Sequence, residues 1–159
     1  MIFVTVGTHQ QPFDRLLGAL GALDPGELVV QYGPAEPPPG VARAEPYMPF
    51  ERVLAHLREA ETVITHAGVG SILCARREGH VPIVVPRRHD LGEHVDDHQA
   101  ELTRALEPHG GIVALWDVAE LTAAVARSTR AAEPPSGDTA SLRASVRAAL
   151  LGDQASSPA

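Results

Sequence analysis

The stretch Thr62-Val-Ile-Thr-His-Ala-Gly-Val-Gly-Ser71 decides the fold, because a β-branched run leads into a glycine-rich turn and then into a helical segment. The run predicts a buried strand at 62–65, and the residues after the turn predict a helix at 69–77. Gly68 and Gly70 let the backbone approach a ligand closely, and the exposed amides of the following helix favour an anion, above all a phosphate. The same pattern also fits a tight turn that binds nothing.

Similar segments lie on both sides of this stretch. Further strands are predicted at 2–6, 28–32, 41–44, 82–85 and 111–116, and further helices at 12–23, 50–57, 93–106, 118–130 (capped by Asp117) and 139–151. Their alternation predicts an α/β fold, in which a parallel sheet has helices on both faces. The loops 7–11, 66–71 and 86–92 then emerge at the carboxyl edge of the sheet, where such folds bind ligands.

The composition is that of one globular domain. The chain has 159 residues, of which 44% are hydrophobic and 21% charged, so wholesale disorder is excluded. We expect a single domain at residues 1–151 and a flexible tail at 152–159. The single cysteine, Cys74, cannot form an internal disulfide, and the apolar runs are far shorter than the ~20 residues that span a bilayer. No basic segment precedes the first strand, so we see no signal peptide and expect a cytoplasmic protein.

The charged residues exclude several classes of ligand. The net charge is −7 and all 13 basic residues are arginine, so we do not expect a nucleic-acid-binding protein. The absence of lysine excludes the phosphate-binding loop of the P-loop nucleotide hydrolases. Leu73 stands where the dinucleotide fingerprint needs its third glycine, which argues against nicotinamide cofactors.

Two other loops at the same edge carry polar residues. Gly7-Thr8-His9 repeats the small turn after the first strand, so two such turns can bracket a diphosphate, with His9 either a donor to phosphate or a solvated loop histidine. In the segment 87–99, Arg87 and Arg88 can neutralise phosphate charge. Four residues of that segment either bond sugar hydroxyls or form a solvated helix start that the helix dipole favours: Glu93, Asp96, Asp97 and Gln99.

The histidines of the same segment raise the question of a metal. His94 and His98 stand four residues apart on one predicted helix face, a spacing that can chelate zinc. No metalloprotease signature accompanies them and Cys74 lies in another element, so we expect no metal site. Cys74 stands among apolar residues, which favours a small buried side chain over a nucleophile.

Four motifs in order resemble glycosyltransferase family 28: Met1–Leu16 (MIFVTVGTHQQPFDRL), Thr65–Leu73 (THAGVGSIL), Pro82–Arg87 (PIVVPR) and Gly92–Gln99 (GEHVDDHQ). The resemblance is to the donor-binding C-terminal domain of that family, over about residues 1–130. It implies a single Rossmann-like domain, the C-terminal half of a GT-B fold. More narrowly, the chain resembles the small catalytic subunits of two-component transferases, both those of bacterial exopolysaccharide synthesis and the eukaryotic subunit that adds the second N-acetylglucosamine to a dolichol-linked sugar.

The resemblance implies a UDP-sugar donor site without metal or cofactor, because helix dipoles and amides offset the charge of the leaving group in this class. Backbone amides and the hydroxyl of the last residue would hold the diphosphate, from Gly7, Thr8, Ala67, Gly68, Val69, Gly70 and Ser71. His66 would lie beside the diphosphate, and the backbone near Met48 would bind the uracil edge. Asp97, His98 and Gln99 would contact the donor sugar.

The chain departs from the family pattern on the helix after the glycine-rich turn. The family has a Glu that binds the ribose hydroxyls three residues after the Ser or Thr of that turn, and Cys74 stands there in this chain. A Cys cannot accept two strong hydrogen bonds. Glu78, one helical turn onward, is the candidate substitute.

The chain also supplies only one of the two halves of a GT-B transferase. The resemblance therefore implies that the acceptor half and the general base come from a membrane-anchored partner subunit, which would make the chain peripheral to the membrane through that partner. A homodimer in isolation is left open. The apolar face of the helix predicted at 139–151 is a candidate docking element, with packing onto the chain's own domain as the alternative.

The expected function is that of a UDP-sugar-dependent glycosyltransferase subunit. With its partner it would transfer a hexosyl or N-acetylhexosaminyl group to a lipid-linked acceptor in polysaccharide synthesis. One alternative is a non-catalytic UDP-sugar-binding sensor or scaffold, which the Cys74 departure supports. Another is a UDP-sugar epimerase of the same architecture, although those enzymes carry both domains in one chain.

Overall fold

A computed structural model describes residues 1–128, 144 and 147 of the chain. Six strands form one parallel sheet in the order β3-β2-β1-β4-β5-β6. They are β1 Ile2–Thr5, β2 Leu28–Gln31, β3 Arg43–Glu45, β4 Thr62–His66, β5 Ile83–Val85 and β6 Val113–Ala114. The α/β class, the parallel sheet and its six predicted strands are therefore confirmed.

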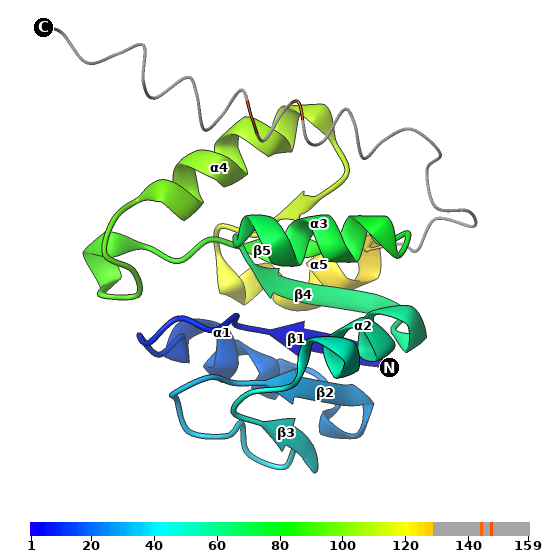
Figure 1. Ribbon diagram of the computed structural model, residues 1–159. Helices are drawn as coiled ribbons and strands as arrows, with labels where there is room; N and C mark the ends of the chain where they lie inside the picture. The colour runs from blue at the N-terminus through cyan, green and yellow to red at the C-terminus, as the bar shows by residue number, and fades with distance from the viewer. Residues whose placement is uncertain (129–143, 145–146, 148–159) are drawn as a thin grey trace, which may run out of the picture.

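Helices cover both faces of this sheet (Figure 1). They are α1 Asp14–Ala19, α2 Phe50–Glu59, α3 Val69–Arg77, α4 His98–Leu106 and α5 Leu121–Arg127. α1 and α5 pack on one face, and α2, α3 and α4 pack on the other. Most of the helix predicted at 139–151 and all of the tail predicted at 152–159 lie outside the described residues. Within the part of the chain that the structure describes, no helix combines the length and the apolar character of a membrane span.

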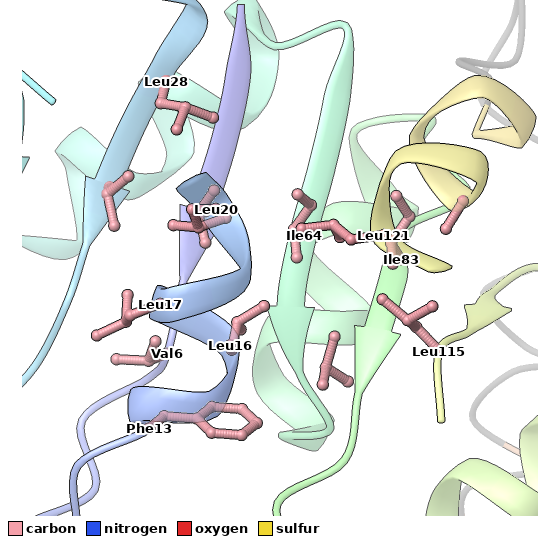
Figure 2. Packing of buried hydrophobic residues seen from close by; sticks show 14 residues of the cluster. Val6, Phe13, Leu16, Leu17, Leu20, Leu28, Ile64, Ile83, Leu115 and Leu121 are labelled. Atoms are coloured by element: carbon pink, nitrogen blue, oxygen red, sulfur yellow. The ribbon is translucent and has the colours of Figure 1, made fainter. Parts of the chain in front are cut away.

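The core has two layers because side chains alternate along each strand and both faces of a parallel sheet are covered. On one face, Leu16 of α1 and Leu20, just after that helix, belong to a fully buried cluster with Ile64 of β4 (Figure 2). On the other face, Phe3 and Val63 pack beneath α2. The strands are thereby fixed on both sides, which gives the loops at their carboxyl ends a rigid base.

The helix predicted at 93–106 begins only at His98, so the prediction was wrong for its first part. Gly92 adopts a left-handed conformation with φ of 70°. The carboxylate of Glu93 then accepts hydrogen bonds from Nε of Arg15 at 2.8 Å and from the backbone N–H of Arg88 at 3.0 Å. Because Glu93 is tied to two other segments in this way, the chain between it and His98 forms a loop instead of a first helical turn.

Two other helix boundaries differ less. α1 begins at Asp14 and continues into a 3₁₀ turn, Leu20–Ala22, within the range predicted as one helix. Near the end of the described chain, a 3₁₀ turn, Val118–Glu120, precedes α5. The predicted cap is confirmed there, because Oδ1 of Asp117 accepts the backbone N–H of Ala119 at 2.9 Å.

The strand order reverses direction at β1, which pairs with β2 on one side and with β4 on the other. In open α/β sheets this reversal leaves a crevice outside the carboxyl ends of the two strands, and ligands bind in it. The turn after β1 and the turn after β4 both open onto this crevice. The topology therefore places the two glycine turns identified in the sequence next to each other.

Candidate functional site

A cavity of about 280 Å³ lies at this crevice, between the ends of β1, β2 and β4 and the helices α2 and α3. Seven of the residues predicted to bind the donor line it: Gly7, Thr8, Met48, His66, Gly68, Gly70 and Ser71. They come from segments far apart in the chain, so the fold gathers them at one place.

The imidazole of His66 stands between the two glycine turns. A Cβ added to Gly7 would lie 2.5 Å from Nε2 of this ring, and one added to Gly68 would lie 2.2 Å from it. Gly7 also has a positive φ of 77°, which disfavours any residue with a side chain. The ring thus leaves no room for a side chain at either position. The sequence alone did not indicate this reason for the two glycines.

His66 is electrically neutral at physiological pH. Burial lowers its pKa from 6.5 to about 4, and the nearby charge of Arg87 acts in the same direction, while a hydrogen bond with the backbone of Thr5 opposes the shift. The ring therefore forms a polar but uncharged part of the cavity wall. It lies against the turns without adding a positive charge of its own.

The N-terminus of α3 opens into the cavity. Gly68 is its N-cap, and no side chain caps the helix by a hydrogen bond. The first amides of a helix have no partner within the helix, and they carry the positive end of its dipole. With Gly70 and Ser71 in the wall, this end of α3 can hold an anion through N–H groups and one hydroxyl.

The turn after β1 is supported from beneath by a polar pair that the sequence analysis missed. The hydroxyl of Thr5 donates to Oε1 of Gln31 at 3.1 Å and accepts the backbone N–H of Gly7 at 3.2 Å. The amide of Gly7 thus has an internal partner, so its role is to shape the turn. A buried Thr and Gln on neighbouring parallel strands are the signal that could have indicated this support.

The remaining wall is apolar and comes largely from α2. The side chains are those of Phe50, Val53 and Leu57, together with Val63 of β4. Phe50 is 61% exposed at the mouth of the cavity, which is unusual for an aromatic residue without a partner. The helical spacing of these residues was visible in the sequence, but not that this helix face borders a cavity.

Cys74 and Glu78, the two residues considered for the ribose, lie in different places. Cys74 lines the cavity, and burial raises the pKa of its thiol, which keeps it protonated at neutral pH. Glu78 lies at the other end of α3, where its carboxylate accepts a hydrogen bond from Nε of Arg58 at 3.3 Å. The structure thus places Cys74, and not Glu78, where a ligand in the cavity would meet it.

Arg87 is buried inside the loop cluster and does not face the cavity. Its guanidinium donates to the carbonyl oxygens of Val6 at 2.8 Å, Gln11 at 2.9 Å and Glu93 at 3.1 Å. It also lies over the ring of Phe13, with 4.7 Å between its Cζ and the ring centroid. Burial lowers the pKa of Arg87 to about 10, so it remains charged. This arginine fastens the loops after β1 and β5 to each other.

Gln99 has a similar internal role. Its Oε1 accepts the backbone N–H of Ala67 at 3.2 Å and that of Arg87 at 3.1 Å, so it joins the chain after β4 to the chain after β5. The N–H of Ala67 is therefore not available to a ligand in this arrangement. Val69 packs against the apolar cluster between α3 and α4. None of these residues lines the cavity.

The other polar residues predicted at this edge lie outside the cavity. Oδ1 of Asp97 accepts a hydrogen bond from the backbone N–H of His89 at 3.3 Å. Nδ1 of His98 lies 3.8 Å from Oε2 of Glu101. The rings of His9 and His94 lie next to each other, tilted by 36°, with 4.6 Å between their centroids. In the described part of the chain, no three His, Cys, Asp or Glu side chains are grouped as a metal ion would require.

Comparisons with known proteins concern the family and the fold of the chain. The profile of the glycosyltransferase family 28 C-terminal domain matches residues 1–133. The UDP-N-acetylglucosamine transferase subunit ALG13 of Eremothecium gossypii is 43% identical over 72 residues, which are 45% of this chain and 34% of that protein. The crystal structure of the glycotransferase of kitacinnamycin is similar, with a TM-score of 0.53 and 21% identity, over 96% of this chain and 42% of that one. This second likeness concerns the fold alone, and the chain spans less than half the length of either relative.

Proposed function

The chain belongs to glycosyltransferase family 28, whose C-terminal domain matches residues 1–133, and on this premise we propose that it binds the nucleotide-sugar donor of a UDP-sugar-dependent glycosyltransferase. The observation that carries the proposal is the uncapped N-terminus of α3, which opens with Gly70 and Ser71 into a cavity at the strand-order reversal. A helix end of this kind suits a diphosphate. The apolar wall and the cavity end near Met48 suit the uracil and ribose.

The proposed reaction is a direct displacement at the anomeric carbon of the donor. The acceptor hydroxyl attacks this carbon, the bond to the β-phosphate oxygen breaks, and UDP leaves with the electron pair. Amides of the α3 N-terminus and the hydroxyl of Ser71 stabilise the charge that develops on the leaving diphosphate. A general base takes the proton of the acceptor hydroxyl, and we assign it to the partner subunit.

The partner and the acceptor are the finer part of the proposal. The relative from Eremothecium gossypii is named as a subunit, and this chain provides one Rossmann-like half. We therefore propose a membrane-anchored partner that binds a lipid-linked acceptor, with this chain on its cytoplasmic side. No metal or cofactor takes part, because amides and the helix dipole supply the electrostatic stabilisation.

Calorimetry with UDP, UDP-N-acetylglucosamine, UDP-glucose and UDP-galactose tests donor binding, with ADP and GDP as controls for the base. We expect UDP and at least one UDP-sugar to bind, and the purine nucleotides to bind at least tenfold more weakly. Absence of binding by all four uridine compounds, both for the chain alone and together with its partner, would contradict the proposal. Transfer of radiolabelled sugar to a lipid fraction then tests the reaction itself.

A non-catalytic UDP-sugar sensor or scaffold remains the second candidate, and the position of Cys74 favours it. Cys74 lines the cavity where the family has a Glu for the ribose, so donor binding loses two strong hydrogen bonds at this point. The two candidates differ in turnover. A chain that binds UDP-sugars but transfers none with its partner present is the sensor, and a chain that transfers is the enzyme.

A further inference from the structure

The wall of the cavity contains a buried amide that the proposed reaction does not use. Gln31, at the carboxyl end of β2, is only 3% exposed, and it lines the cavity together with Thr5, its register partner on β1. Phe3 and Val29 stand two positions before them and pack beneath α2, so both polar side chains lie on that face of the sheet. A buried amide costs free energy unless its donors and its acceptor find partners.

The hydrogen bonds around Thr5 determine which way the amide of Gln31 points. Oγ1 of Thr5 accepts the backbone N–H of Gly7 at 3.2 Å and donates its own proton to Oε1 of Gln31 at 3.1 Å. If the amide were turned over, its NH2 group would face Thr5, and the hydroxyl proton would lose this acceptor. The NH2 group therefore points away from Thr5. Nε2 has no hydrogen-bond partner among the described residues, and it keeps access to the cavity.

The sheet places this donor on the opposite side of the cavity from α3. The helix α3 follows β4, whereas Gln31 ends β2, and β1 lies between these two strands. Two strand spacings, about 10 Å, separate β2 from β4. Met48, toward which we place the uracil, follows β3 and so lies on the same side as Gln31.

A nucleoside diphosphate is long enough to span this distance. With its diphosphate at the N-terminus of α3, its base extends across β1 toward β2. The substituent at C4 of a pyrimidine is the one farthest from the ribose, because C4 lies opposite the ring nitrogen that bears the sugar. This substituent is therefore the group of the base that approaches Gln31.

We propose that Gln31, held by Thr5, selects the base of the donor by donating from Nε2 to the carbonyl oxygen at C4 of uracil. Cytosine has an amino group at this place, and two donors that face each other form no hydrogen bond. A buried donor without a partner costs free energy, so the site discriminates against cytosine. Thr5 is a positioning residue, because it acts through the amide of Gln31. This inference rests on the proposed function, and it assigns the base specificity of that site.

Calorimetry with UDP and with CDP tests the proposal, because the two nucleotides share their ribose and diphosphate and differ only in the base. We expect the unaltered chain to bind UDP about tenfold more tightly than CDP, because one hydrogen bond to a buried donor is gained or lost. The ratio of the two affinities is the quantity compared between variants. A merely structural effect on the cavity would weaken both nucleotides equally and leave this ratio unchanged.

Replacement of Gln31 should reverse the preference. Q31E keeps one oxygen that accepts the hydroxyl of Thr5, and it puts a second oxygen where the NH2 group stood. This second oxygen can accept from the amino group of cytosine, so CDP should bind about threefold more tightly than UDP. Q10E is the matched control, because it makes the same exchange at an exposed glutamine outside the cavity lining. Its affinity ratio should equal that of the unaltered chain.

Replacement of Thr5 tests the positioning. T5V removes the hydroxyl at nearly the same size, so the amide of Gln31 can turn over and present its carbonyl oxygen to cytosine. We expect the preference for UDP to fall from about tenfold to about threefold, mainly because CDP binds more tightly. T5S retains a hydroxyl and should retain the ratio of the unaltered chain.

The outcomes distinguish this proposal from the proposed function. If UDP binds but the affinity ratio is the same in Q31E, T5V and the unaltered chain, the role of Gln31 is overturned and the donor site stands. Equal binding of UDP and CDP by the unaltered chain also overturns it. If neither nucleotide binds the unaltered chain, the donor-site proposal fails as well. Circular dichroism checks the folding of each variant, and T5V decides if the buried charge of Q31E prevents folding.

Discussion

The turn between β4 and α3 and the loop between β5 and α4 leave the same edge of the sheet, and they differ in how their polar groups are used. The first turn has almost no charge, yet its helix end is uncapped and opens into a cavity. The second loop is rich in charge, yet Arg87 and Glu93 are buried and bonded within the chain. Charge in a motif is therefore a poor guide to binding when that charge is buried.

The physical reason is the cost of removing a charge from water. A guanidinium that is fully buried must find carbonyl or carboxylate partners, and once bonded it fixes the segments that supply them. Amides at a helix end remain without partners within the helix. The glycine turn is thus the part able to accept a ligand, and the charged loop is the part that holds this turn in place.

The largest effect is expected when the buried arginine is replaced. R87M leaves the carbonyl oxygens of Val6, Gln11 and Glu93 without their donor, and we expect the free energy of unfolding to fall by about 4 kcal/mol. R88M is the matched control, because Arg88 pairs with Asp90 at the surface, and it should change stability by less than about 0.5 kcal/mol. Urea denaturation measures both, and equal effects would contradict the structural role of Arg87.

The second prediction concerns the pH dependence that His66 gives to stability. Its pKa is about 4 in the folded chain and 6.5 when unperturbed, so between these values the unfolded state binds more protons than the folded state. Stability should therefore fall as the pH is lowered from about 6.5 to about 4, by about 3 kcal/mol from this residue.

The variant H66Q removes this titration. Denaturation at several pH values should show a flatter acid limb for H66Q than for the unaltered chain. The same slope in both proteins would mean that His66 is not buried in its neutral form.

The third prediction tests why the turn needs its glycine. In G68A the new methyl group meets Nε2 of His66 at 2.2 Å, and we expect a loss of about 2 kcal/mol in stability together with weaker UDP binding. G70A is the control for stability, because a Cβ at Gly70 meets nothing within 4 Å and alanine favours a helix. The double variant H66A/G68A should cost less than the sum of its single changes. Additive costs would show that the ring and Gly68 do not meet.

The smallest expected effect concerns Cys74. C74E places a carboxylate in the cavity where the family has its ribose-binding Glu, and we expect uridine to bind about tenfold more tightly. The gain should vanish with 2′-deoxyuridine, which lacks one of the two hydroxyls, and C74S should give no gain. Unchanged or weaker binding of uridine by C74E would contradict the placement of Cys74 beside the ribose.

The sequence predicted most of the fold because the strands are buried on both faces and read as short apolar runs bounded by turns. The prediction from the sequence was wrong at the start of α4, where a tertiary contact determines the backbone conformation. The pairing of Glu93 with Arg15, on a helix distant in the sequence, is not visible in a local pattern that otherwise favours a helix.

The sequence predicted the site only in part, because some of its contacts have a local sequence pattern and others depend on tertiary contacts. The glycine turns and Ser71 have a local signature, and the structure brings them to one cavity. The inward roles of Arg87 and Gln99 depend on carbonyls and amides of other segments, which have no sequence signature. Thr5 and Gln31 were missed because a polar pair on neighbouring strands is recognised only when the strand register is known.

A crystal structure of the chain with UDP would show directly whether the end of α3 binds the diphosphate. We expect the diphosphate at the N-terminus of α3, within about 3 Å of the amide of Gly70 or Ser71, with the uracil toward Met48. A structure in which UDP occupies another surface, such as the groove beside Trp116, or leaves the cavity empty at saturating concentration, would contradict it.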